Sequence, residues 1–153
     1  MDFCLWFKTW MPFAVGFGFS LCLGQFAAQE VVRPLYALVG VDRRNKSAKI
    51  LGLVERTIYT ASTYLGSPEF VGAWLVLKVA GQWGKWSEKE GRAWFNAFLV
   101  GTGISLMYGV VGGYLISWIA QHDWSKALTV PLSLIGGSIC LICYARHIQH
   151  IDS

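Results

Sequence analysis

The sequence predicts an all-α membrane protein, a polytopic transmembrane helical bundle. Of its 153 residues, 54% are hydrophobic and 14% charged, whereas soluble domains carry roughly 25% charged residues. The mean hydropathy is +0.44, and the long apolar segments are separated by short polar ones, which is the pattern of multiple membrane spans. The aliphatic and aromatic content excludes a disordered chain, and four cysteines are too few for a disulfide scaffold.

The first expected span covers residues 11–29 and contains only apolar, small or weakly polar side chains. It differs from a cleaved signal peptide, because Lys8 is offset by Asp2 and Phe26 disrupts a small-residue cleavage site. A basic loop follows at residues 30–49, which we expect in the cytoplasm. Pro34 and Gly40 predict that no long helix continues through it.

The next two segments, residues 50–65 and 68–83, are expected to form a helical hairpin. Gly66 suits the position just after a helix C-terminus, and Ser67 suits the N-cap of the next helix. Pro68 fits the first helical position, and Glu69 lies where the helix dipole favours an anion. A helix end followed at once by a helix start predicts that the two helices fold back on each other.

The last two expected spans cover residues 94–120 and 127–145 and are separated by a short polar turn. Residues 1–153 therefore form a single transmembrane domain of about five spans, or four if the 50–82 hairpin is re-entrant.

The distribution of cations predicts the orientation. With the N-terminus outside and the C-terminus inside, nine of the 13 Lys and Arg residues lie inside, two outside and two within spans. This satisfies the positive-inside rule, and a re-entrant hairpin leaves the count unchanged. The inner set is Arg33, Arg43, Arg44, Lys46, Lys49, Lys85, Lys89, Arg92 and Arg146. Because the charge is sorted by membrane side and forms no continuous basic face, a nucleic-acid partner is not expected.

Three charged residues, Glu55, Arg56 and Lys78, fall within the hairpin helices. Glu55 and Lys78 are each eleven residues from the turn at Gly66 and Ser67, so they reach equal depth, roughly 16 Å from the turn and toward the inner face. A lone charge there costs about 2.5–3.5 kcal/mol, so pairing is expected. One interpretation is an ion, proton or headgroup site. The other is a salt bridge that fixes the hairpin register, with Arg56 extending to the inner phosphates.

Small residues recur at every fourth position in two of the expected spans, as in membrane helices that approach closely. Either the two spans pack on each other, or the stripe faces a second chain. The stripes are Gly16, Ser20, Gly24 and Ala28 in the first span, and Ala97, Gly101, Ser105, Gly109, Gly113 and Ser117 in the fourth.

The remaining motifs do not predict catalysis. Cys140, Cys143, His147 and His150 share one helix face, but Cys140 should lie inside the lipid, so no metal site is expected. The sequence contains no phosphate-binding glycine loop and no hydrolase or zinc-protease motif. We therefore expect no catalytic residues and no cofactor.

One part of the sequence resembles a segment of small uncharacterised bacterial inner-membrane proteins, in which a Gly-x-x-Glu-Arg helix is followed by a turn and a second helix ending in Lys. The residues that carry this resemblance are Gly52 to Arg56 (Gly-Leu-Val-Glu-Arg), Gly66, Val71-Gly72 and Lys78. The similarity covers about 30 of the 153 residues. It implies a multi-pass protein of the bacterial inner membrane and a shared role for Glu55, Arg56 and Lys78.

Together these features favour a non-enzymatic integral membrane protein. We expect it to act through helix–helix assembly, as a homo-oligomer or as an accessory subunit of a membrane complex. Its expected partners are the lipid bilayer and other membrane subunits or itself, with Arg43, Arg44, Lys46 and Lys49 contacting lipid headgroups or a partner. The alternative is a small transporter, channel or lipid-modifying enzyme that uses the Glu55, Arg56 and Lys78 cluster.

Overall fold

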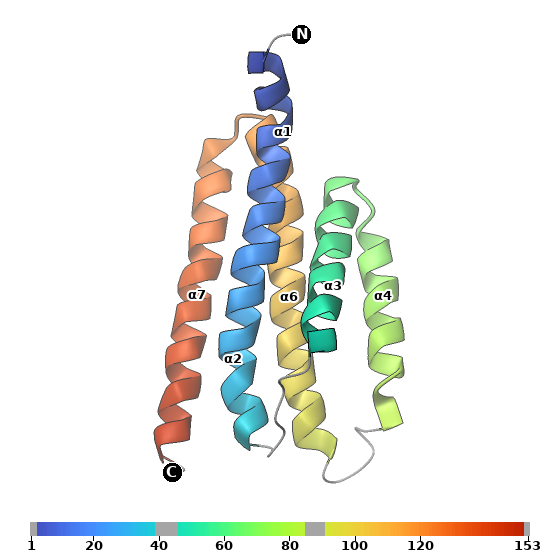
Figure 1. The fold of residues 1–153 in the computed structure, drawn as a ribbon, viewed down its shortest axis with the longest axis vertical. Helices are drawn as coiled ribbons and strands as arrows, with labels where there is room; N and C mark the ends of the chain where they lie inside the picture. Colours follow the sequence, from blue (N-terminus) through green and yellow to red (C-terminus); the bar gives the residue numbers. More distant parts are fainter. Residues whose placement is uncertain (1–2, 39–45, 85–90, 152–153) are drawn as a thin grey trace.

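The computed structural model describes residues 3–38, 46–84 and 91–151. They are helical, with no strand in these ranges, which confirms the all-α prediction. The helices are α1 (Phe3–Gly18), the π-helix η1 (Phe19–Leu23), α2 (Gly24–Leu38), α3 (Lys46–Tyr64), α4 (Pro68–Ala80), α6 (Gly91–Ala120) and α7 (Trp124–Ile151). The segments α1, η1 and α2 follow one another without a break and form one long rod (Figure 1).

Three segments within the described residues are long and apolar enough to cross a membrane: Lys8–Ala37, Gly91–Ala120 and Trp124–His147. Helices α3 and α4 are not among them. Helix α4 has 13 residues, which corresponds to about 20 Å of helix, whereas a bilayer core is about 30 Å thick.

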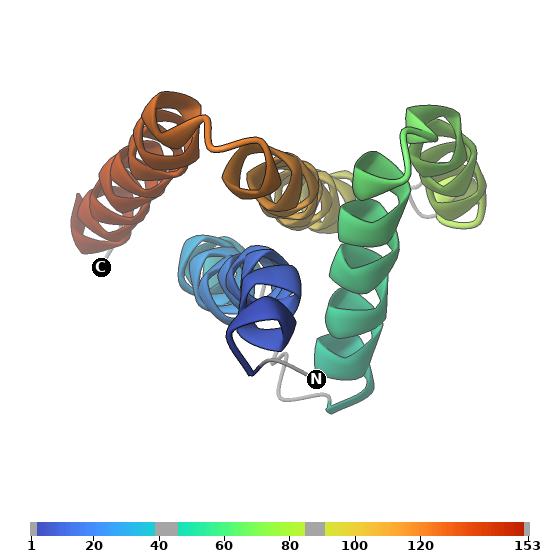
Figure 2. The same cartoon turned by 90° about the horizontal axis from the view of Figure 1, so that it is seen from above.

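Helix α6 is central to the bundle. The α1–α2 rod, α3 and α7 all pack against it, and seen from above, α7 and the α3–α4 hairpin lie at opposite edges (Figure 2). Helix α4 is the most peripheral, because it packs mainly against α3. Helix α7 is also peripheral, with exposed apolar side chains such as Leu128, Leu132 and Ile139, as expected for a surface that faces lipid.

The α3–α4 hairpin has the predicted turn. Gly66 has φ 73°, and the amides of Gly66 and Ser67 bond back to the carbonyls of Thr63 and Ser62. This is the Schellman pattern that ends a helix with a residue in the left-handed region. Ser67 occupies the N-cap position of α4 without a capping side-chain hydrogen bond, and Pro68 follows at the first helical position.

The second hairpin, between α6 and α7, uses the same backbone pattern with His122 at the left-handed position, φ 60°. Asp123 then caps α7 by accepting a hydrogen bond from the Lys126 amide. The Lys126 ammonium lies 2.7 Å from the Asp123 carboxylate. These bonds from Lys126 hold the pKa of Asp123 below its usual value.

The helix through residues 30–38 differs from the predicted loop. Pro34 lies inside α2, although proline removes one helical hydrogen bond. Val31, Val32 and Tyr36 are buried at 4% exposure or less, and Val32 and Tyr36 pack with Ala97 of α6. Tertiary burial therefore sustains the helix through Pro34, and the prediction of a break there is wrong. Gly40 lies outside the described residues.

The glycines of α6 allow close backbone contact with its neighbours. A Cβ at Gly109 would lie 2.5 Å from the Cβ of Tyr59 in α3, and one at Gly113 would lie 2.6 Å from the Cβ of Thr63. Gly101 faces Val32 of α2 at 3.0 Å. The small-residue stripe of α6 is thus occupied by helices of the same chain.

We expect Gly109→Leu to destabilise the protein by roughly 1–3 kcal/mol, because the added side chain must displace Tyr59. The measurement is the thermal unfolding midpoint in detergent. Gly103→Leu is the matched control, since a Cβ at Gly103 meets no described atom within 4 Å. Equal midpoints for the two variants would show that the Gly109 contact does not contribute to packing.

Candidate functional site

The predicted charged residues lie near the middle of the bundle. Their partners on α6 are Thr102 and Ser105, and Ser105 is the fifteenth of the 30 residues of that helix. The hairpin turn lies level with Gly113, since a Cβ there would touch Thr63 and the Tyr64 amide. Helix α6 continues to Ala120, about 10 Å further. The depth of the charges relative to the inner face of a membrane stays a prediction.

Glu55 and Lys78 form an ion pair between α3 and α4. The Lys78 Nζ lies 2.7 Å from Glu55 Oε2, and the side chains are 14% and 3% exposed, respectively. Lys78 also donates a hydrogen bond to Thr102 Oγ1 of α6 at 2.8 Å. Its ammonium lies 4.9 Å from the ring centroid of Phe98 on α6, close enough for a cation–π contact. Lys78 therefore links α4 to α6 as well as to α3.

Arg56 is directed away from that pair into the α2–α3–α6 interface. Its side chain is 1% exposed. Nη1 donates to Ser105 Oγ at 3.0 Å, and Nη2 donates to Gln25 Oε1. The expectation that Arg56 extends to inner phosphates is therefore wrong. Successive helical side chains point about 100° apart, which explains why Glu55 and Arg56 contact different neighbours.

Helix η1 positions the partner of Arg56. A π-turn adds one residue to a helical turn and changes the facing of the residues after it. Within η1, Ser20 is fully buried and accepts a hydrogen bond from Thr60 of α3 at 2.9 Å. Just beyond η1, Gly24 and Gln25 both meet Arg56. A Cβ at Gly24 would lie 2.9 Å from Arg56 Cδ.

Sequence reasoning missed Gln25 and Thr102 as partners of this cluster. Their only signal was a polar residue in an otherwise apolar segment, which is too common to single them out. The π-helix that orients Gln25 has no simple sequence signature either.

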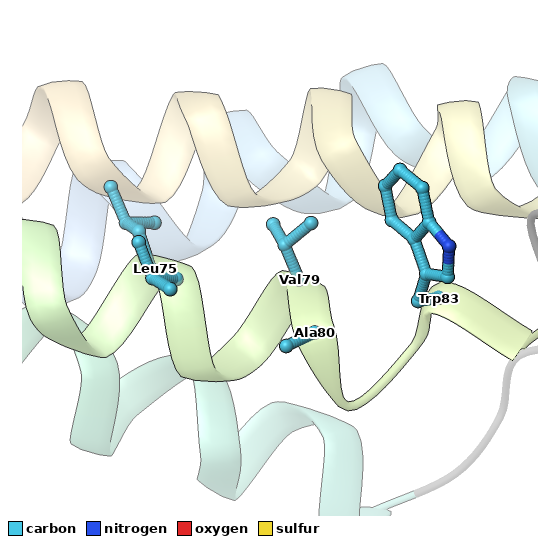
Figure 3. Close-up of a pocket in the computed structure, with 5 residues that line it drawn as sticks. Leu75, Val79, Ala80 and Trp83 are labelled. Carbon is cyan, nitrogen blue, oxygen red and sulfur yellow. The ribbon is translucent and has the colours of Figure 1, made fainter.

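Two surface hollows in the described part of the chain have no charged residue in their lining. One runs along α4 beside Leu75, Val76, Val79, Ala80 and Trp83 (Figure 3). The other is lined by aromatic and small residues of α1. Both are lined by apolar residues, so neither provides access to Glu55, Arg56 or Lys78.

The other predicted groups remain apart from this site. Cys140, Cys143 and His147 are exposed on α7, and no group of three potential metal ligands occurs among the described residues. The side chain of His150 lies outside the described part. Of the basic loop residues, Lys49 is exposed on α3. Arg43, Arg44 and the Lys46 side chain lie outside the described residues.

Comparison with known protein families, curated proteins and solved structures finds no match. Function is therefore inferred from the side-chain arrangement. The buried cluster contains two cations and one carboxylate, and the carboxylate pairs with Lys78. A closed ion pair of this kind stabilises the hairpin position only while both charges are present.

We expect Glu55→Gln and Lys78→Met each to destabilise the protein by about 3 kcal/mol, because each leaves one buried charge unpaired. The double variant should recover much of this loss, since neither charge remains. Thermal unfolding of the wild type, the two single variants and the double variant in detergent gives the coupling energy between Glu55 and Lys78. Additive losses would contradict a stabilising pair. A folded Glu55→Gln variant that has lost an activity would instead indicate a functional site.

Proposed function

We propose that the protein is a non-enzymatic integral membrane protein that acts through helix–helix assembly, as a homo-oligomer or an accessory subunit. The observation that supports this proposal is a contrast between two sets of glycines. Gly101, Gly109 and Gly113 of the stripe each have a neighbour of the same chain within 3.0 Å of a Cβ built on them. Gly136 and Gly137 of α7 are exposed, and a Cβ on either meets no described atom within 4 Å.

Adjacent glycines inside a helix reduce its stability. Each is about 1 kcal/mol less favourable than alanine in a helix interior. In membranes, small residues allow a second helix to approach closely. Because packing within the described chain does not use Gly136 or Gly137, a helix of another subunit explains them best. The assembly surface is therefore the outer face of α7, with Leu132 and Cys140 one turn on either side of Gly136.

The proposed topology is the four-segment form in the bacterial inner membrane, with three full spans and the re-entrant hairpin as the fourth segment. The N-terminus is outside and the C-terminus inside. The start of α1, near the N-terminus, and the end of α7, near the C-terminus, lie at opposite ends of the bundle (Figure 1). This arrangement fits an odd number of membrane crossings. The short α4 and the position of the turn below the end of α6 favour the re-entrant form. In this topology Arg43, Arg44, Lys46 and Lys49 contact anionic headgroups on the inner side.

Cross-linking through Cys140 tests the assembly surface. A variant that retains Cys140, with Cys4, Cys22 and Cys143 replaced by Ser, is treated in membranes with a thiol oxidant or a bis-maleimide. We expect an adduct of twice the mass for a homo-oligomer, or of another mass for a foreign subunit. Adding Gly136→Leu should abolish it, because the added side chain separates the helices.

The matched control retains Cys22 instead, which is also exposed but lies on η1. The proposal fails if Cys22 gives the same adduct in equal yield, or if Gly136→Leu leaves the Cys140 adduct unchanged.

Cysteine accessibility tests the re-entrant hairpin. In intact vesicles of known orientation, a membrane-impermeant maleimide should label Gln121→Cys at the α6–α7 turn but not Ser67→Cys. Ser67→Cys should react only after detergent is added, because its turn lies within the bilayer. Equal labelling of the two positions from the same side would support five full spans.

A second candidate function is a small transporter, channel or lipid-modifying enzyme. The observation that favours it is Arg56, a charged residue buried at mid-bundle with neutral hydrogen-bond partners. Ionisable residues in such positions often mark ion or substrate pathways.

A further inference from the structure

Helix α7 presents a thiol and an imidazole on the face that points away from the bundle. Cys143 and His147 are exposed, whereas Ala145, midway between them, is buried. Successive residues of a helix are rotated by about 100°, so Ala145 is about 200° from each of the two. The thiol and the imidazole therefore lie together on the side of α7 opposite its contact with the bundle.

The spacing of these two side chains is that of metal ligands on a helix. Residues four apart are neighbours on one face, with Cβ atoms about 5–6 Å apart, and helical zinc motifs place two ligands at this spacing. Thiolate and imidazole both bind zinc, and two of each complete a common type of structural site. No group of three candidate ligands occurs among the described residues of one chain. One chain therefore provides half of such a site.

A second copy supplies the other half if α7 is the assembly surface, and this step rests on the function proposed above. Gly136 precedes Cys143 by seven residues and His147 by eleven, so all three point within about 20° of one another. Copies inserted in one orientation are related by a two-fold axis along the membrane normal, which brings each residue opposite its counterpart. Two α7 helices that meet at Gly136 thus place two thiols and two imidazoles at the same depth.

The surroundings of Cys143 and His147 suit a metal ion. His147 ends the apolar segment Trp124–His147, and in the proposed topology this end lies at the cytoplasmic surface, where thiols stay reduced. Arg146, next to His147, is bonded to Glu30 of α2 at 2.6 Å. Its charge is therefore directed toward its own chain. The shallow crossing angle of about 20° that is usual in membrane bundles keeps two helices close over several turns.

We propose that two copies of the chain share one zinc ion between their α7 helices, held by Cys143 and His147 of each copy. Cys140, whose expected depth in the lipid argues against a metal, is not a ligand of this site. Because ligation needs both copies, zinc strengthens the assembly. If zinc binds only the dimer, each tenfold excess of zinc over its dissociation constant strengthens dimerisation by about tenfold.

Cobalt(II) tests the ligands, because it occupies zinc sites and its absorption reports the coordinating atoms. The full chain in detergent, kept reduced with a phosphine and stripped of metal with a chelator, is titrated with cobalt(II). We expect a thiolate-to-cobalt band and the visible bands of tetrahedral cobalt, saturating at one cobalt per two chains and displaced by zinc. Cys143→Ser and His147→Ala should lose these bands. The matched control Cys140→Ser, an exposed thiol on the same helix, should retain them.

Dimerisation is measured separately, by analytical ultracentrifugation in detergent with chelator or with zinc. In chelator the wild type, Cys143→Ser and His147→Ala should dimerise equally, because the contact at Gly136 is unchanged. Zinc should strengthen dimerisation of the wild type and of Cys140→Ser only. Gly136→Leu should lose both the dimer and the cobalt bands.

The outcomes separate this site from the assembly surface. A wild type that dimerises in chelator but gives no thiolate–cobalt band overturns the shared site and leaves assembly through α7 standing. Saturation at one cobalt per chain, without a change in dimerisation, overturns it by assigning the metal to a single copy. A chain that stays monomeric with and without zinc overturns both the shared site and the homo-oligomer.

Discussion

The close approach of helices to α6 is the constraint on which the structure depends. At Gly109 and Gly113, any side chain would collide with the backbone or Cβ atoms of α3. Gly112 likewise lies against Ser20 and the Gly16 carbonyl of the first rod. Between helices that cross a membrane there is no hydrophobic force, so a bundle of such helices depends on packing and polar contacts. The glycines allow close packing and short polar contacts between the helices.

Because the backbones lie close, short polar side chains can bond across the interfaces. Thr60 donates to Ser20 between α3 and η1, and Tyr108 donates to Ser138 between α6 and α7. The same closeness encloses Arg56 and the Glu55–Lys78 pair at mid-bundle. Measured hydrogen bonds between membrane helices contribute modestly, about 0.6 kcal/mol on average. The stability of this interior therefore depends more on the fit around the charges than on any one bond.

The sequence was sufficient to predict the helical class, the hairpin and its turn at Gly66, because hydropathy and turn chemistry are local properties. It also placed Glu55 and Lys78 at equal depth, since helical rise alone determines that. It could not give the continuation of α2 through Pro34, which depends on burial of Val32 and Tyr36 against α6. Nor could it give the direction of Arg56, which depends on the π-turn before Gln25. Both depend on contacts between distant segments.

The two buried charge systems are coupled through Glu55. The Glu55 carboxylate attracts the Arg56 guanidinium, and its Oε2 is bonded to Lys78. Lys78 in turn is the polar contact that connects α4 to Thr102 of α6. One carboxylate therefore connects the buried Arg56 to the contact that holds α4 against the bundle.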